Sequence, residues 1–127
     1  KGDSECYIDY QEHAKMGIWR STVTEEYQPY IKPQDCANHM STKWLKLFGS
    51  ETVRFETDKT FEFSALHYTI EELYEKAHAF ELENSKSTEV IICYKNKGVG
   101  STSCGPRLEN KYCVTDKKID FRFNICL

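Results

Sequence analysis

The sequence predicts a mainly β fold, an antiparallel β-sandwich with one short helix near residues 70–77. Segments of alternating apolar and polar residues, typical of half-buried strands, recur along the chain and predict about seven strands. Helical spacing occurs in a single segment. The length of 127 residues suits one domain, spanning residues 1–127, and is too short for a (β/α)₈ barrel of about 250 residues.

The N-terminal part is predicted to be extended or irregular. Residues 1–12 are mostly polar and predict irregular backbone. Residues 16–27 place Ile18, Trp19 and Val23 among threonines, which predicts a strand.

The central part predicts three strands. Residues 43–48 alternate between apolar and polar side chains and end at a turn over residues 49–50. Residues 52–57 and 60–67 carry apolar side chains at every second position on either side of Asp58-Lys59. We therefore expect these two segments to pair as a hairpin, with Asp58-Lys59 as its turn.

A helix is predicted for residues 70–77. Thr69 and Glu72 have the spacing of a capping box, in which each side chain bonds a free backbone N–H of the first helical turn. The apolar residues that follow fall on one helical face: Ile70, Leu73, Tyr74 and Ala77.

Three further strands are predicted after the helix, at residues 79–82, 89–95 and 119–125. The last alternates most clearly, and its apolar face holds Ile119, Phe121, Phe123 and Ile125. Residues 98–106, rich in Gly and Ser, predict a loop.

The charge balance and hydropathy exclude two classes of partner. Lys and Arg number 17 and Asp and Glu number 20, for a net charge of −3. A nucleic-acid-binding domain carries a basic surface, so we expect no nucleic-acid partner. The longest apolar run covers only residues 90–93, so we expect no membrane partner.

The cysteines leave two interpretations open. As disulfides they would staple a secreted interaction domain. As reduced thiols, the interpretation favoured here, they act as small apolar residues within the predicted strands. Reduced thiols are typical of the cytoplasm, which is the compartment that we expect. The six are Cys6, Cys36, Cys93, Cys104, Cys113 and Cys126.

No pattern marks a catalytic or metal site. None of the acidic residues is set apart by spacing or apolar surroundings as a glycosidase pair, so no catalytic residue is assigned. A zinc site from Cys93, Cys104 and Cys113 matches no common zinc spacing, and no cofactor is assigned to this chain. The histidines show no metal-binding spacing either: His13, His39, His67 and His78.

Three side chains have both a functional and a structural interpretation. Trp19 and Trp44 have faces suited to stacking on sugar rings, but packing in the core is the simpler interpretation. Cys104 is followed by Gly105-Pro106 and therefore lies in a loop, where function concentrates. A functional thiol and a partly buried loop thiol both remain open for Cys104.

Six short motifs follow one another along nearly the whole chain: Glu5-x-Tyr7 with Asp9, Tyr30-Ile31-Lys32-Pro33-Gln34-Asp35 to Asn38-His39, Phe61-x-Phe63-Ser64, Tyr68-Thr69, Gly98-x-Gly100 and Asp120-Phe121-x-Phe123. In this order and spacing they resemble the C-terminal domain of the β-galactosidases of glycoside hydrolase family 2. Asp35 stands where the family usually has Glu, and Cys36-Ala37 replaces a pair that usually ends in Gly. An alanine where glycine tolerates positive φ is expected to alter the local turn.

The resemblance implies a larger parent enzyme, a retaining β-galactosidase acting on terminal β-D-galactosides. The domain would be the C-terminal part of a supersandwich similar to that of galactose mutarotases. The catalytic barrel and the magnesium and sodium ligands of the parent would lie upstream, so Lys1 is expected to fall inside a longer polypeptide. Implied partners are the upstream domains, the galactoside substrate and further copies of a homo-oligomeric parent.

The resemblance also implies a site in this chain. In the family, a loop of this domain reaches the galactose pocket and carries tryptophan in some members and cysteine in others. Cys104 matches that position, so we expect Cys104 and Ser103 to contact the substrate. The alternative is a stand-alone carbohydrate-binding β-sandwich module with exposed aromatic residues. The isolated fragment would leave an open sheet face and is expected to self-associate.

Overall fold

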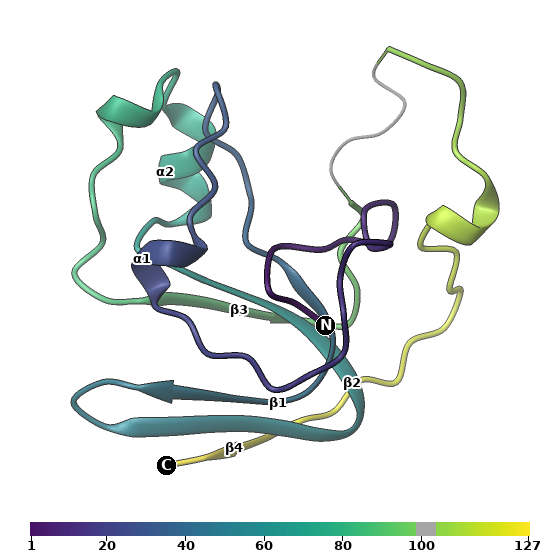
Figure 1. Cartoon of the computed structure of the whole chain (residues 1–127), viewed down its shortest axis with the longest axis horizontal. Coiled ribbons are helices and arrows are strands. Elements are labelled where there is room, and N and C mark those ends of the chain that lie inside the picture. Colours follow the sequence, from purple (N-terminus) through teal and green to yellow (C-terminus); the bar gives the residue numbers. More distant parts are fainter. Residues whose placement is uncertain (99–103) are drawn as a thin grey trace.

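In a computed structural model that describes residues 1–98 and 104–127, the strands form one antiparallel sheet. Strand β2 lies at its centre, with β1 along one edge and β3 and β4 in succession along the other (Figure 1). The fold is thus mainly β and antiparallel as predicted, and it is consistent with a β-sandwich-like domain. The described strands are β1 (His39–Phe48), β2 (Thr52–Leu66), β3 (Glu89–Cys93) and β4 (Asn124–Cys126).

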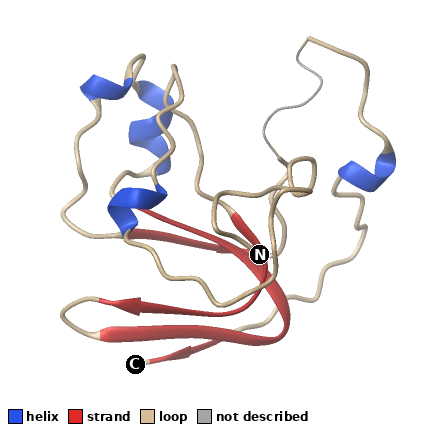
Figure 2. Ribbon diagram, in the orientation of Figure 1, coloured by secondary structure: helices blue, strands red, loops and turns tan. Residues whose placement is uncertain are grey.

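The helical elements are short and lie outside the sheet (Figure 2). They are the helices α1 (Val23–Glu26) and α2 (Ile70–Glu75) and the 3₁₀ turns η1 (Ala79–Glu81) and η2 (Asn110–Tyr112). The prediction of a single short helix is therefore incomplete. In the described ranges, no helix has the length and apolar character needed to span a bilayer.

The strand predicted over residues 16–27 is wrong, because a capping box closes a helical turn at α1. The Thr22 hydroxyl accepts a hydrogen bond from the Glu25 N–H at 3.3 Å, and the Glu25 carboxylate accepts one from the Thr22 N–H at 3.0 Å. These local bonds outweigh the strand preference of the threonines and Val23.

The hairpin predicted around Asp58-Lys59 is also wrong, because β2 runs unbroken through these residues. Thr42 pairs with Phe61 and Trp44 with Glu56, so Lys43 alone faces residues 57–60. This mismatch is a β-bulge in β2, which absorbs the extra residues without reversing the chain. The reversal occurs instead between β1 and β2, where the Gly49 N–H donates to the Glu51 carbonyl at 3.0 Å.

Helix α2 is confirmed, although it ends two residues before the predicted boundary. The Thr69 hydroxyl caps it by accepting from the Glu72 N–H at 3.0 Å, whereas the Glu72 carboxylate accepts from the Glu83 N–H at 2.8 Å. Leu73 is buried, but Tyr74 on the predicted apolar face is 81% exposed. The strand predicted at residues 79–82 is wrong, since η1 occupies residues 79–81 and Leu82 caps it.

The C-terminal strand is shorter and less buried than its pattern predicts. Only β4 pairs with the sheet, and Ile119 and Ile125 are 53% and 58% exposed. Because no second layer of the described chain covers these side chains, alternation alone does not bury them. The count of seven strands is likewise wrong for the described residues, which form four.

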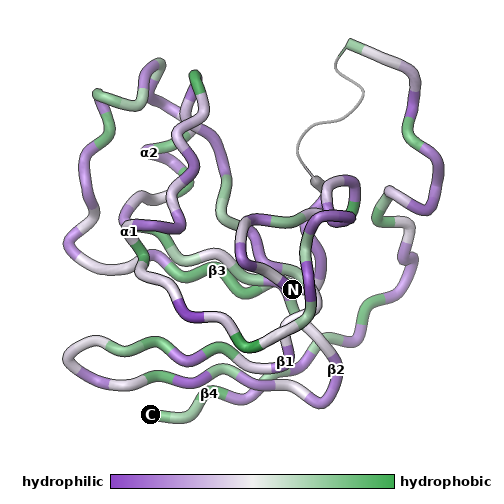
Figure 3. Tube along the Cα trace, in the orientation of Figure 1, coloured by the Kyte–Doolittle hydropathy of each residue, from purple (hydrophilic) through white to green (hydrophobic). Residues whose placement is uncertain are grey.

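The core lies where α2 and the loop before β1 meet the second half of β2. Cys36, Ala37, Leu66 and Leu73 are each at most 3% exposed and pack against Tyr27, Tyr30, Tyr68 and Leu82. Apolar residues also recur along β1 and β2 outside this core (Figure 3). There, register places five partly exposed apolar residues on one side, which we name the apolar sheet face: Leu45, Leu47, Val53, Phe55 and Ile125.

We predict that the isolated chain self-associates, because the apolar sheet face then leaves water. Sedimentation velocity over a range of concentrations should show oligomers whose share grows with concentration. A single monomer boundary at the highest concentration would contradict the prediction.

Candidate functional site

The chain leaves the sheet after β3 and returns to it at β4, and we name residues 96–115 between these strands the arm. In Figure 1 the described residues 104–115 lie away from the sheet, and the chain leads back toward it after η2. Cys104 lies in the arm and is exposed. The predicted site residue Ser103 falls outside the described residues.

An ion pair closes the base of the arm. The Lys95 ammonium lies 2.6 Å from one carboxylate oxygen of Asp116, and the Tyr94 hydroxyl donates to the other at 3.2 Å. Hydrogen bonding within the pair raises the pKa of Lys95 and lowers that of Asp116, so both groups stay charged near neutral pH. The Tyr94 ring also packs edge-on against Phe121, with centroids 6.1 Å apart. The two ends of the arm are therefore held together.

A buried carboxylate fixes the first residue of the arm. Glu62, on β2, is 5% exposed and accepts hydrogen bonds from the Asn96 N–H at 3.0 Å and from the Asn38 side-chain amide at 2.8 Å. Burial raises the pKa of Glu62, although these two bonds oppose that shift. The Asn96 side-chain amide also donates to Asp35 at 3.3 Å. Asn96 is thus tied to both β2 and the loop before β1.

Gly98 allows a close approach between the arm and the N-terminal segment. Its φ of +112° is a conformation that residues with a Cβ rarely adopt. A Cβ at this position would collide with the Asp9 carboxylate. The backbone at Gly98 can therefore pass close to Asp9 only because this residue has no side chain.

The N-terminal segment, residues 1–10, is irregular as predicted but lies partly in the interior. Its Glu5 carboxylate is 6% exposed and accepts from the Ala37 N–H at 2.9 Å, from the Tyr7 hydroxyl at 3.2 Å and from the Tyr30 hydroxyl. Burial, and then the nearby Glu5 charge, raises the pKa of Tyr7, which keeps this donor protonated. The Cys6 N–H adds a bond of 2.7 Å to the Asn38 carbonyl.

The loop before β1 contains Ala37, the alanine that we expect to alter the local turn. Ala37 has a φ of +62°, in the left-handed region that favours glycine. Its side chain is fully buried and its N–H points to Glu5. The hydrogen bond and the packing hold alanine in a conformation that is strained for it.

His39 and Glu26 form a second, partly buried link, with 2.6 Å between the His39 Nε2 and a Glu26 oxygen. Burial raises the pKa of Glu26, but the hydrogen bond and charge of His39 outweigh it and lower the pKa overall. A lowered folded pKa means that the pair stabilises the fold above the unfolded pKa and loses this contribution as pH falls through the folded pKa.

We therefore predict that the denaturant midpoint falls between neutral pH and pH values below about 4, and falls less in Glu26→Gln. Glu51→Gln, at an exposed turn, is the matched control and should follow the wild-type chain. If the denaturant midpoint falls with pH equally in the wild type and in Glu26→Gln, the ion pair does not cause the loss of stability.

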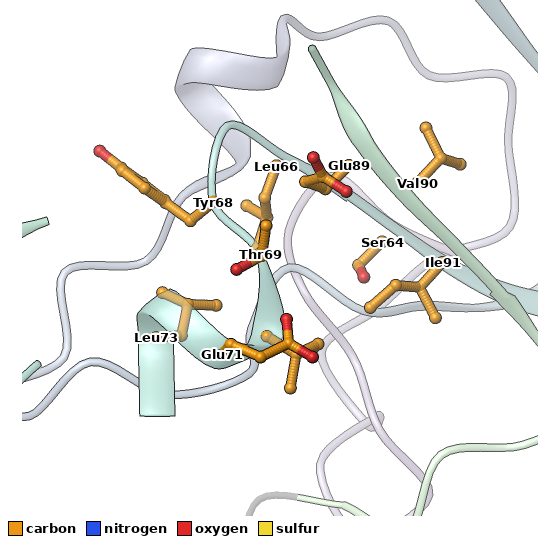
Figure 4. A pocket seen from close by; sticks show the side chains of 10 residues that line it. Ser64, Leu66, Tyr68, Thr69, Glu71, Leu73, Glu89, Val90 and Ile91 are labelled. Carbon is orange, nitrogen blue, oxygen red and sulfur yellow. The ribbon is translucent and has the colours of Figure 1, made fainter. Parts of the chain in front are cut away.

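A pocket of about 180 Å³ lies between α2 and the strands β2 and β3 (Figure 4). Its walls are largely apolar, including Leu66, Leu73, Val90 and Ile91. Its carboxylates come from Glu71 on α2 and Glu89 on β3, and Glu89 already accepts from the Ser85 hydroxyl at 3.0 Å. No reactive group converges on the apolar wall, so we assign this hollow to incomplete packing.

The other predicted chemical residues are dispersed. Trp19 and Trp44 are 48% and 42% exposed, so the interpretation that they pack in the core is wrong. Across the residues that the structure describes, no three His, Cys, Asp or Glu side chains gather as a metal site, Cys93, Cys104 and Cys113 included. All six cysteines are free thiols.

Comparison with known proteins decides the family. The profile of the family described as "Beta galactosidase small chain" matches residues 1–127. The chain belongs to this family. Its relatives include a β-galactosidase of Actinobacillus pleuropneumoniae, 36% identical over 98% of this chain, and one of Staphylococcus xylosus, 32% identical over 98%. A β-galactosidase of Kluyveromyces lactis is 29% identical over 98% of the chain.

This small-chain domain spans only 12%, 13% and 12% of the length of these three relatives. Two of its exposed features stand out: the arm with its exposed thiol, and the apolar sheet face. The carboxylates of Glu5 and Glu62 are buried and accept hydrogen bonds that hold distant parts of the chain together. We therefore assign these two residues a structural role. The spacing of apolar residues in the sequence does not predict their burial.

Proposed function

We propose that this chain is the C-terminal segment of a retaining β-galactosidase of glycoside hydrolase family 2, which hydrolyses terminal β-D-galactosides. The small-chain profile covering every residue is the observation that carries the proposal. The short span of the chain within relatives named β-galactosidase supports a longer parent polypeptide. Such hydrolysis uses two carboxylates about 5–5.5 Å apart, which we assign to the parent outside this chain.

In this proposal the chain has two tasks. The apolar sheet face packs against the upstream domains and completes the sandwich, which removes its half-exposed side chains from water. The arm reaches the galactoside pocket and presents Ser103 and Cys104 to the sugar. Because its base is closed by Lys95 and Asp116 and its start is bonded to Glu62, the arm is suited to hold a wall of the pocket in place.

Magnesium and sodium belong, in this proposal, to other parts of the parent enzyme. The described residues of this chain provide no cluster that fits either ion. We also propose a homo-oligomeric parent in the cytoplasm, and the six free thiols support a reducing compartment.

We predict that Cys104→Trp in the intact parent lowers the KM for galactosides about threefold to tenfold, because an indole offers more area for stacking on the sugar than a thiol. The ratio of transfer to added alcohol acceptors over hydrolysis should change as well. Steady-state kinetics with a chromogenic galactoside measures both.

Cys126→Trp is the matched control, since Cys126 is also exposed but lies on β4. It should leave KM and the acceptor ratio unchanged. If Cys104→Trp behaves like this control, the arm does not line the sugar pocket.

A further inference from the structure

A second hollow lies on the opposite, polar side of the sheet from the apolar sheet face. It has a volume of about 250 Å³. Register places Trp44, Glu56 and Asn124 in line across β1, β2 and β4, with Arg54 two residues from Glu56 on the same side. Its lining residues are Lys43, Trp44, Arg54, Glu56, Thr57, Asp58 and Asn124.

The β-bulge in β2 accounts for the hollow. At residues 57–60, four residues of β2 stand opposite Lys43 alone, so the strand bends away from its regular path. Thr57 and Asp58 of the bulge both line the hollow. The irregularity thus produces a concave site in a sheet face that would otherwise be flat.

Trp44 is held in place at this hollow. The Arg54 guanidinium carbon lies 5.5 Å from the centre of the Trp44 ring, and the Arg54 Nε donates to Glu56 at 2.8 Å. Arg54 therefore covers part of the indole and is itself oriented by Glu56. A tryptophan that is 42% exposed among charged neighbours, and fixed by one of them, presents a preformed apolar surface.

The polar groups around Trp44 balance in charge. Lys43 and Arg54 contribute two positive charges, and Glu56 and Asp58 contribute two negative charges, so the lining is neutral overall. A neutral site with both signs disfavours phosphorylated ligands and simple cations alike. It suits a ligand whose hydroxyl groups both donate and accept, and Asn124 adds a side chain with both capacities.

We propose that this hollow binds a neutral saccharide, with one pyranose ring stacked on Trp44 and its hydroxyls bonded to Glu56, Asp58 and Asn124. The site stands on β1, β2 and β4 and does not involve the arm. It therefore does not depend on the proposed role of Cys104, and one can fail without the other.

Saturation-transfer NMR on the 127-residue chain with lactose, methyl β-D-galactopyranoside and maltose tests the proposal. We expect transfer from the protein to the ring protons of at least one of these sugars. Trp44→Ala should weaken binding about threefold to tenfold, and Trp44→Phe should retain most of it.

Trp19→Ala is the matched control, because Trp19 is similarly exposed but does not line the hollow. It should bind sugar like the wild-type chain, with circular dichroism confirming that each variant is folded. Absence of transfer to all three sugars, or equal binding by Trp44→Ala and the wild type, would overturn the proposal. The proposal would also be overturned if the wild-type chain binds no sugar and Trp44→Ala no longer self-associates, because Trp44 would then belong to a protein interface.

Discussion

Replacing Glu5 by alanine is expected to destabilise the chain by about 3–5 kcal/mol, because the substitution leaves several buried donors unpaired. The Ala37 N–H and the hydroxyls of Tyr7 and Tyr30 all lose their acceptor. A domain of this size is stable by only about 5–15 kcal/mol, so this loss is a large share of the total. Urea denaturation at one fixed protein concentration measures the loss.

Glu12→Ala is the control for this experiment, since Glu12 lies nearby in sequence and is exposed. Its effect should stay within about 0.5 kcal/mol. Hydrogen exchange should locate the damage of Glu5→Ala at residues 1–10 and at the loop before β1. Equal stability of the two variants would refute the structural role of the Glu5 carboxylate.

Replacing Glu62 by alanine is expected to release the start of the arm and to cost about 2–4 kcal/mol. The Asn96 N–H and the Asn38 amide lose their shared acceptor, and Asn38 also donates to the Cys6 carbonyl at 2.8 Å. Amide exchange at residues 94–98 and 104–116 should therefore accelerate more than exchange in β3.

Glu62→Gln separates the hydrogen bonds from the charge. The glutamine carbonyl still accepts, so the loss of stability should be smaller than in the alanine variant. Burial raises the pKa of Glu62, so this group contributes stability below its unfolded pKa that is lost as pH rises through the folded pKa. Glutamine does not titrate, so the stability of Glu62→Gln should lack this fall with rising pH. If exchange in the arm is the same in Glu62→Ala and in the exposed control Glu51→Ala, Glu62 does not anchor the arm.

Local patterns predicted the elements that local forces decide. Residues 43–48 alternate and lie in β1, residues 89–95 contain β3, and Thr69 caps α2 where its spacing predicts. Asp58-Lys59 misled the prediction because turn residues also occur in β-bulges, and only pairing with β1 distinguishes the two. Thr22 and Glu25 have the spacing of a capping box, but the β-branched residues around them favour a strand.

Burial was harder to predict because it depends on contacts between distant residues. Glu62 stands at a polar position of an alternating strand pattern, which predicts exposure, and Glu5 lies in a mostly polar segment. Their partners Ala37 and Asn96 lie 32 and 34 residues away in the chain. Conversely, Ile125 has a clear strand pattern but lies exposed, because burial needs a layer that the described residues lack. The exposure of Cys104 agrees with a loop position, while its contact with substrate stays a prediction.

Reconstitution tests most directly whether this chain completes a β-galactosidase. The remaining part of the parent polypeptide is assayed for chromogenic β-galactoside hydrolysis with and without this chain, beside the intact parent as a positive control. We predict little hydrolysis without the chain and restored hydrolysis when it is added. Full activity of the remaining part alone would contradict the account and leave this chain as an accessory module.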